Sequence, residues 1–189
     1  MIVVFGLGNP GSDYEHTRHN VGFDAVSKAA AFFQTELKKR CFRMYRQAKV
    51  VSETGENALL IQPLTYMNNS GQIVSYFKPS DTFVVVCDNM DLAVGGLRVR
   101  QGGGSSGQKG LNSIAQMLGT NDFTRIYIGI GRPGTDVSVL DHVLGIESDP
   151  TKKDLLEKAI EDAAKAIVKF INGASVGDLQ LEFNRKGVL

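Results

Sequence analysis

Cysteine is scarce in this sequence. Cys41 and Cys87 are the only two in 189 residues, and no further cysteine or histidine stands at a zinc-finger spacing. A disulfide-stapled scaffold and a cysteine-rich zinc site are therefore both excluded. A chain with so few thiols is expected in a reducing compartment, and we expect a cytoplasmic protein.

Long apolar runs and a large excess of charge are also missing. The longest apolar runs, such as residues 29–33, are far shorter than the roughly 20 residues that cross a bilayer. Met1 leads directly into apolar residues with no basic segment before them, so we expect no signal peptide and no membrane partner. The formal net charge of +1 argues against wholesale coating by nucleic acid but allows a local basic patch. With 42% hydrophobic residues, the chain has enough apolar content to exclude disorder as its main state.

Apolar segments of strand and helix periodicity alternate along the chain. Strands are expected at residues 1–7, 49–53, 58–61, 82–87, 97–101 and 124–130, and helices at residues 23–37, 71–77, 111–118 and 151–171. This alternation predicts an α/β fold with one three-layer domain over residues 1–189, in which a mixed, mostly parallel sheet has helices on both faces. Ligands of such sheets bind outside the carboxyl ends of the strands, and we expect the site in the segments that follow them, at residues 8–20, 63–70, 88–96 and 102–110.

Residues 6–11 match the dinucleotide-binding pattern G-x-G-x-x-G after a strand. That pattern needs a helix to open inside it, whereas Pro10 and a polar segment intervene here, and the next strand comes too late to place a ribose-binding acid. A tight turn explains the glycines but leaves Asn9 unexplained.

Residues 103–107 match the nucleophile-elbow pattern G-x-S-x-G, which would make Ser105 a covalent catalyst. The match is weak, because glycine is abundant in this segment. The only later histidine, His142, directly follows Asp141, and neighbouring side chains rarely face each other. A mobile glycine-rich loop over a site is the favoured interpretation.

Histidine and asparagine supply the remaining polar candidates. His16 and His19 lie three residues apart, but a catalytic zinc site needs three protein ligands, and no third stands nearby, so no metal is expected. His19 could act as a base near neutral pH. Five asparagines follow the predicted strands, where the residue type is common in turns but can also hold a carbonyl or an oxyanion: Asn9, Asn20, Asn68, Asn69 and Asn89.

Residues 38–49 carry six positive charges, two aromatic rings and no acid. Such a composition is typical of a surface that contacts nucleic-acid phosphates and stacks on bases. A solvated connector between a helix and a strand explains it equally well. Further positive charge is expected near the strand ends, from Arg98, Arg100, Lys109, Arg125 and Arg132.

Four segments together resemble the bacterial peptidyl-tRNA hydrolase family. They are GLGNPGSDYEHTRHNVGFDAV (6–26), LIQPLTYMNNSG (60–71), VVCDNMDLAVGGLRVR (85–100) and RIYIGIGRPG (125–134). The combination of GNPG, TRHN and TYMN at these distances is highly specific, and the likeness runs in order over almost the whole chain. The resemblance implies a metal-free and cofactor-free enzyme that hydrolyses the ester between a peptide and the 3′-terminal ribose of tRNA, recycling tRNA from aborted translation. It implies peptidyl-tRNA as the partner, and we expect a monomer.

The same resemblance implies roles for individual residues. His19 corresponds to the general base that activates water, and Asp88 to the acid that holds its ring. Asn9 corresponds to the amide that recognises a blocked peptide. Further residues are implied to contact the substrate or the tRNA: Tyr14, Asn20, Tyr66, Met67, Asn68, Lys109 and Arg132.

The sequence departs from the family pattern in one loop above all. The usual Gly-His-Asn-Gly reads Gly107-Gln108-Lys109-Gly110, so that a site asparagine is replaced by lysine. The usual His-Asp-Glu reads Cys87-Asp88-Asn89, and Tyr66 replaces a phenylalanine. The altered loop motivates the alternative of a non-catalytic, RNA-binding relative with the same fold.

Overall fold

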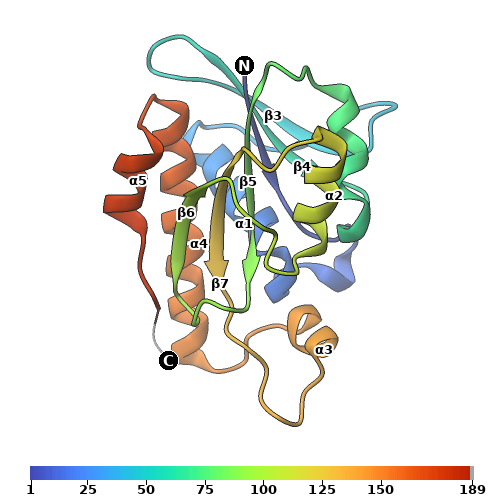
Figure 1. Cartoon of the computed structure of the whole chain (residues 1–189), viewed down its shortest axis with the longest axis vertical. Helices are drawn as coiled ribbons and strands as arrows, with labels where there is room; N and C mark the ends of the chain where they lie inside the picture. The colour runs from blue at the N-terminus through green and yellow to red at the C-terminus, as the bar shows by residue number, and fades with distance from the viewer. Residues whose placement is uncertain (188–189) are drawn as a thin grey trace.

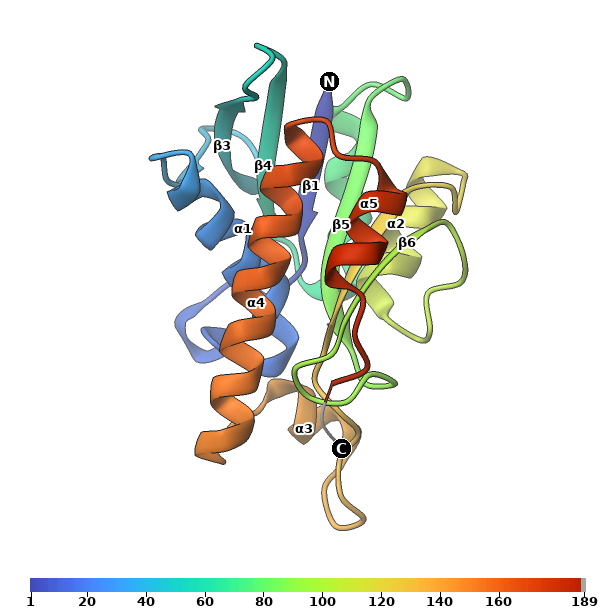
Figure 2. The ribbon, with the colours of Figure 1, turned by 90° about the vertical axis from the view of Figure 1, so that its left-hand side faces the viewer.

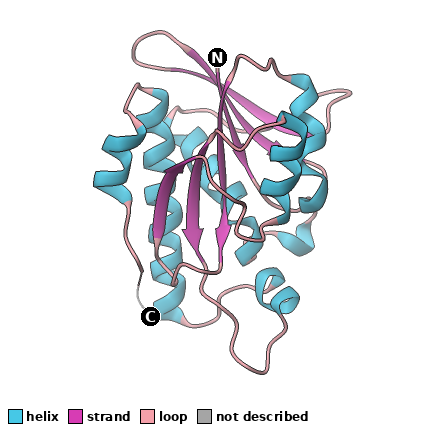
Figure 3. Cartoon of the chain, in the orientation of Figure 1, coloured by secondary structure: helices cyan, strands magenta, loops and turns pink. Residues whose placement is uncertain are grey.

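The computed structural model describes residues 1–187 and has the predicted α/β class. A seven-stranded sheet in the order β2-β3-β4-β1-β5-β7-β6 crosses the centre of the molecule (Figure 3). Four central strands run parallel: β4 (Asn57–Pro63), β1 (Ile2–Gly6), β5 (Thr82–Asn89) and β7 (Thr124–Gly129). The flanking strands β3 (Tyr45–Val51) and β6 (Leu97–Gln101) are antiparallel to their neighbours, and the short β2 (Lys38–Lys39) pairs with β3.

Alternating side chains of the central strands supply two separate cores. Val4, Val84 and Ile126 face the helices α1 (Val21–Phe32), α4 (Pro150–Ile171) and α5 (Val176–Phe183). Phe5 and Val85 face the 3₁₀ segment η3 (Met67–Tyr76) and the helix α2 (Lys109–Leu118). The chain thus forms the expected three layers, and α1 and α4 pass behind the strands in Figure 1 while α2 lies in front (Figure 2 gives the orthogonal view).

The carboxyl ends of the parallel strands meet at one edge of the sheet. The arrowheads of β5 and β7 point towards this edge, where α3 (Val139–Leu144) lies (Figure 1). Two short 3₁₀ turns, η1 (Ser12–Tyr14) and η2 (Arg18–Asn20), follow β1 at the same edge and lead into α1. Gly22 lets the start of α1 lie directly on the sheet, because a Cβ there would overlap the carbonyl of Val86 and the backbone of Leu7. The residues before α1 are therefore held close to the end of β5.

Several predicted boundaries were wrong. The predicted helix at residues 71–77 is a 3₁₀ segment that begins earlier, at Met67, and the first helix ends at Phe32, short of Leu37. Strand β3 begins at Tyr45, inside the basic segment, because the ring of Tyr45 is buried against Tyr76 and Phe77. The basic segment is thus largely a β-hairpin, which we call the basic hairpin (residues 38–49).

The helices α3 and α5 were not predicted. Both begin with a serine whose hydroxyl accepts a hydrogen bond from the backbone N–H three residues later: Ser138 from Asp141, and Ser175 from Asp178. The Ser-x-x-Asp spacing at each start is a capping signal that could have revealed them. None of the helices within residues 1–187 combines the length and the apolar character of a membrane-spanning segment.

Candidate active site

An open cleft of about 570 Å³ lies at the carboxyl edge of the sheet. Its walls come from segments far apart in sequence: the two turns after β1, the start of η3, the end of β5, the start of α2, and α3. Eight of the ten predicted site residues line it: Asn9, Tyr14, His19, Tyr66, Met67, Asn68, Asp88 and Lys109. Tertiary folding therefore brings together most of the polar side chains singled out in the sequence.

His19 and Asp88 face each other at the floor of the cleft. Nδ1 of His19, in η2, lies 3.0 Å from Oδ2 of Asp88, near the end of β5. The side chains are only 15% and 5% exposed, so water does not screen the pair fully. The buried Nδ1 makes no well-aligned hydrogen bond within the described residues, which means that its N–H lies off the line to the carboxylate. Catalytic contacts in empty sites are often poorly aligned in this way.

The second oxygen of Asp88 is held by the loop that departs from the family pattern. Nε2 of Gln108 donates to Oδ1 of Asp88 at 3.0 Å, and its Oε1 accepts from the backbone N–H of Leu111 at 3.0 Å. Gln108 is buried and forms the N-cap of α2. The sequence marked this residue only as a departure, and its contact with Asp88 could be seen only in the fold.

Asn9 has its amide oriented by the backbone. Its Oδ1 accepts from the backbone N–H of Met67 at 2.8 Å, which leaves the Nδ2 hydrogens as the donors available to the cleft. Asn20 holds the backbone of Asn9 at both ends, since its Oδ1 accepts from the Asn9 N–H at 2.8 Å and its Nδ2 donates to the Asn9 carbonyl at 2.9 Å.

Asn20 and Arg132, which were predicted to contact the substrate or the tRNA, do not line the cleft. The amide of Asn20 is buried, and both its oxygen and its nitrogen are hydrogen-bonded to the backbone of Asn9. Arg132 borders a neighbouring hollow, where its guanidinium pairs with Asp91. Asn89 also serves a turn, because its Oδ1 accepts from the backbone N–H groups of Asp91 and Leu92.

Two aromatic rings and an amide mark the mouth of the cleft. Tyr14 and Tyr66 pack edge to face with their centroids 6.4 Å apart. Tyr66 is 58% exposed and Asn68 is exposed beside it. An exposed aromatic face next to a polar side chain suits stacking against a nucleobase or a ribose.

The glycine-rich loop after β6 begins at the opposite edge of the sheet, because β6 runs antiparallel to β7. The prediction that this loop follows a carboxyl end at the site edge was therefore wrong, although its last residues, Ser106 to Lys109, do reach the cleft. Arg125, expected to add surface charge, is fully buried, and its guanidinium donates to the carbonyl of Gly104. Arg125 thus anchors the loop and contributes nothing to a charged surface.

Helix α3 forms an apolar wall that the sequence did not indicate. Val139, Leu140, Val143 and Leu144 line the cleft, and the first two are more than half exposed. Arg18, next to His19 in η2, ties this wall down, since Nη2 of Arg18 lies 2.8 Å from Oε2 of Glu147. Burial acts to raise the pKa of the Glu147 carboxyl, but hydrogen bonds from Arg18 and from the backbone of Asp149 outweigh it and hold the pKa below its usual value.

Competing chemistries find no support in this geometry. Ser105 does not line the cleft, and Nε2 of His142 is 2.9 Å from the carbonyl of Gly131, at a different hollow. His16 lies beside Asp24 and does not contact Asp88, the carboxylate that faces His19. Burial raises the pKa of the Cys87 thiol well above its usual range, and the Asp88 carboxylate raises it further while Arg125 opposes both. Cys87 is therefore a neutral thiol.

A family model described as peptidyl-tRNA hydrolase matches residues 3–188. The peptidyl-tRNA hydrolase of Shouchella clausii is 43% identical over 176 residues, covering 88% of this chain and 91% of that protein. The enzyme of Bacillus subtilis is 38% identical over 191 residues, covering 98% and 100%. The crystal structure of peptidyl-tRNA hydrolase from Acinetobacter baumannii is 33% identical and superimposes with a TM-score of 0.87, covering 98% of this chain and 95% of that chain.

Proposed function

Since the chain belongs to the peptidyl-tRNA hydrolase family and releases tRNA from peptidyl-tRNA, we propose that His19 is the general base of this ester hydrolysis. The observation that carries the proposal is the 3.0 Å separation between Nδ1 of His19 and Oδ2 of Asp88 on the floor of the cleft. The carboxylate orients the ring and stabilises the positive charge that develops on it. Nε2 then faces the cleft with its lone pair free.

The proposed reaction needs one water and one base. Nε2 of His19 takes a proton from the water as its oxygen attacks the ester carbonyl carbon. The tetrahedral intermediate then collapses, the bond to the ribose oxygen breaks, and the proton on His19 passes to that leaving oxygen. An ester is already activated towards attack, and a positioned base typically contributes about 10²–10⁴-fold to such a step.

Asn9 is proposed to recognise the peptide. Because its Oδ1 accepts from the Met67 N–H, the amide is turned so that its Nδ2 hydrogens can donate into the cleft, and such donors match a peptide carbonyl. A free aminoacyl group lacks that carbonyl and would leave the Asn9 donor unpaired, at a cost in free energy. This arrangement would favour blocked over free aminoacyl-tRNA.

Asn68 and Lys109 are proposed to act on the charged parts of the substrate. The amide of Asn68, exposed at the mouth, is suited to stabilise the developing oxyanion. Lys109 is the first residue of α2, it is exposed, and it makes no ion pair within residues 1–187. Its ammonium is therefore free to attract a phosphate near the 3′ end of the tRNA. Tyr14, Tyr66 and Met67 would line the path of the terminal nucleotide and peptide.

The basic hairpin is proposed to contact tRNA phosphates farther from the ester. Lys39 and Arg46 are exposed and stand directly opposite each other across the β2–β3 pair. Like charges in that position destabilise a sheet, and a bound phosphate would relieve the repulsion between them. Arg43 lies over the ring of Tyr76 and Phe42 is fully exposed beside it, which adds a stacking surface. Arg132 is proposed to add a further phosphate contact outside the cleft.

The experiment is release of tRNA from N-acetyl-aminoacyl-tRNA. His19→Ala is expected to lower turnover at least about a hundredfold, whereas His16→Ala, three residues away and beside a different carboxylate, should stay within about twofold. The parent rate should fall as the solution is acidified, because a protonated His19 cannot take a proton from water. Equal turnover in His19→Ala and the parent would refute the mechanism. Tight tRNA binding without ester cleavage in the parent would instead favour the non-catalytic RNA-binding alternative.

We also propose that the protein acts as a monomer in the cytoplasm. A single chain supplies both members of the catalytic pair and every wall of the cleft within residues 1–187. Its substrate is a product of translation. Sedimentation of the free protein at micromolar concentration tests the first point.

A further inference from the structure

We propose that Gln108 is a positioning residue that sets the proton arrangement of the catalytic pair. This inference rests on the proposed role of His19 and concerns the one loop where the sequence departs most from its family. Three contacts hold the Gln108 amide: Leu111 N–H to Oε1 at 3.0 Å, Nε2 to Asp88 Oδ1 at 3.0 Å, and Nε2 to Met67 Sδ at 3.2 Å.

Helix capping decides which way round the amide lies. The backbone N–H of Leu111 can only donate, so it must face the oxygen of the amide and not its nitrogen. The nitrogen is then turned towards Asp88. Gln108 is buried, and the two ends of its amide have different partners. A flipped amide would place its nitrogen against the Leu111 N–H and its oxygen against the Asp88 carboxylate, so that neither end would form a hydrogen bond.

The amide in turn acts on the protons of Asp88 and His19. The Nε2–H of Gln108 donates to Oδ1 of Asp88, so that oxygen is already used as an acceptor. Oδ2 is the oxygen left to face Nδ1 of His19 at 3.0 Å, and a carboxylate oxygen beside a ring nitrogen favours a proton on that nitrogen. The lone pair is consequently on Nε2, the atom that must take the proton from water. The hydrogen bond that caps the start of α2 thus helps to decide which ring nitrogen of His19 carries the proton.

Capping alone does not require glutamine. Serine and asparagine are better N-cap residues, and glutamine spans one more carbon than asparagine. The extra length lets one side chain reach the helix N–H and Asp88 together. Gly110 supports this packing, because a Cβ there would overlap Met67 Sδ and Leu7 Cδ1, so the first turn of α2 lies close against the floor of the cleft.

Two substitutions separate positioning from capping. Gln108→Asn keeps a capping side chain but is too short to reach Asp88 as well. We expect a melting temperature close to that of the parent and a kcat lowered about tenfold, with KM within about twofold. Gln108→Glu keeps the length but places a second carboxylate against Asp88. The two then share a proton, and the acid limb of the pH–rate profile should move to higher pH.

Nitrogen NMR of the His19 ring gives a readout that a merely structural role would not move. The parent should show Nδ1 protonated and Nε2 unprotonated at the pH of full activity, and Gln108→Glu should disturb that pattern. The matched control is Gln116→Glu, the same change on the exposed face of the same helix, which should leave kcat within about twofold.

The outcomes distinguish this inference from the proposed function. If kcat, pH profile and ring spectra of Gln108→Asn and Gln108→Glu match the parent while His19→Ala is inactive, positioning by Gln108 is wrong and the mechanism stands. If His19→Ala is also active, the proposed mechanism fails first. A fall in melting temperature that accounts for the whole loss of activity in Gln108→Asn would reduce Gln108 to a capping residue.

Discussion

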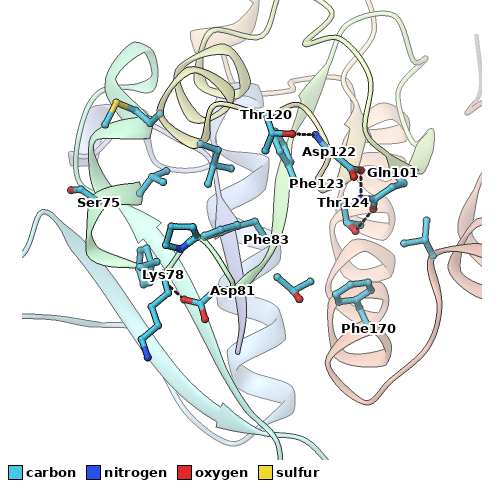
Figure 4. A pocket seen from close by; sticks show the side chains of 17 residues that line it. Ser75, Lys78, Asp81, Phe83, Gln101, Thr120, Asp122, Phe123, Thr124 and Phe170 are labelled. Atoms are coloured by element: carbon cyan, nitrogen blue, oxygen red, sulfur yellow. Dashed lines mark hydrogen bonds between the residues drawn. The ribbon is translucent and has the colours of Figure 1, made fainter.

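The two ends of the sheet carry hollows of nearly equal volume and very different chemistry. The cleft at the carboxyl edge measures about 570 Å³, and a hollow at the amino edge measures about 580 Å³. The amino-edge hollow, drawn in Figure 4, lies between the starts of β5 and β7, the end of α2 and the last turn of α4. Volume alone therefore does not distinguish the two.

Several carboxylate, amide and hydroxyl groups of the amino-edge hollow are paired within the protein, although the Lys78 ammonium has no ion-pair partner within residues 1–187. Asp81 accepts from the Lys78 backbone N–H and lies 3.3 Å from the N-terminal ammonium. Gln101 donates to Asp122 at 2.7 Å and accepts from Thr124 at 2.8 Å (Figure 4). The carboxylates of Asp81 and Asp122 and the amide of Gln101 are thus already satisfied by protein and are not free to act on a substrate.

The cleft leaves polar atoms without protein partners. The Nδ2 hydrogens of Asn9, the Nε2 of His19 and the ammonium of Lys109 all lack a hydrogen-bond or ion-pair partner within residues 1–187. Polar atoms that have no partner within the folded protein can form hydrogen bonds or ion pairs with a substrate. The comparison teaches that unsatisfied polar atoms, and not the size of the hollow, mark the reactive end of this sheet.

Asn9→Asp tests the free donor and should have the largest effect after loss of His19 itself. The carboxylate can still accept from the Met67 N–H, so the fold is kept, but the donor to the peptide carbonyl is lost. We expect kcat/KM on N-acetyl-aminoacyl-tRNA to fall about 10- to 100-fold. The preference over unblocked aminoacyl-tRNA should narrow in parallel. Asn69→Asp, at an exposed asparagine outside the cleft, is the control, and an equal loss there would remove the argument for a specific donor.

Substitutions in the basic hairpin test a third region of the molecule. This region carries exposed positive charges but none of the proposed catalytic residues. Lys39→Ala with Arg46→Ala should raise KM for peptidyl-tRNA severalfold and leave kcat unchanged. The slope of log(kcat/KM) against log(salt) should become shallower by about one per side chain removed. Turnover of a short peptidyl ester of the CCA end should be unaffected. An unchanged salt slope would contradict phosphate binding by the hairpin and would favour the alternative that the segment is a solvated connector.

Glu147→Gln tests how the α3 wall of the cleft is held, because it removes the ion pair between Glu147 and Arg18. Arg18 and Glu147 are both largely buried, and we expect the free energy of unfolding at pH 7 to fall by about 1–2 kcal/mol. The pKa of Glu147 is lower in the folded protein than in the unfolded chain, where it is near 4.5. The ionised carboxylate therefore stabilises the fold fully above pH 4.5, and this contribution is lost as the pH falls through the folded pKa. Urea unfolding at pH 7 and pH 4 measures this, and the difference between parent and variant should shrink at the lower pH. A constant difference would mean that Glu147 acts by packing alone.

Gln101→Ala should have the smallest effect on catalysis. It removes two internal hydrogen bonds of the amino-edge hollow and costs stability by up to about 1 kcal/mol, because Gln101 is exposed. Turnover should remain within about twofold of the parent. A larger loss of kcat at a temperature where the variant is folded would show that the two ends of the sheet are coupled.

Local patterns in the sequence were sufficient for the layers. The apolar runs that became β1, β5 and β7, and the stripe of α4 that includes Leu156, Ile160 and Ile167, are all buried as expected. Periodicity works here because each element buries a continuous face. It failed for α3, whose six residues are too few to show a period, and for β3, where the buried ring of Tyr45 lies among charges.

The candidate site could be predicted residue by residue where motif resemblance was strong, as for Asn9, His19 and Asp88. Their meeting in one cleft depends on strand order, because β1 and β5 are neighbours only after the sheet has formed. Asn20 shows the opposite case: its motif position implied substrate contact, but its amide is consumed by Asn9. Sequence spacing does not reveal which polar atoms have been used by neighbours.

The sequence by itself determined the fold class, the family and the chemical types available for catalysis, because hydrophobic period and motif spacing are local properties of the chain. Only the tertiary structure decided which of those groups remain free, which oxygen of Asp88 faces His19, and that Gln108 holds the other. The side chains that meet in this cleft come from distant parts of the chain: Gln108 lies 20 residues from Asp88, and Asn9 lies 58 residues from Met67. Such pairings depend on the packing of distant elements, and no local pattern encodes them.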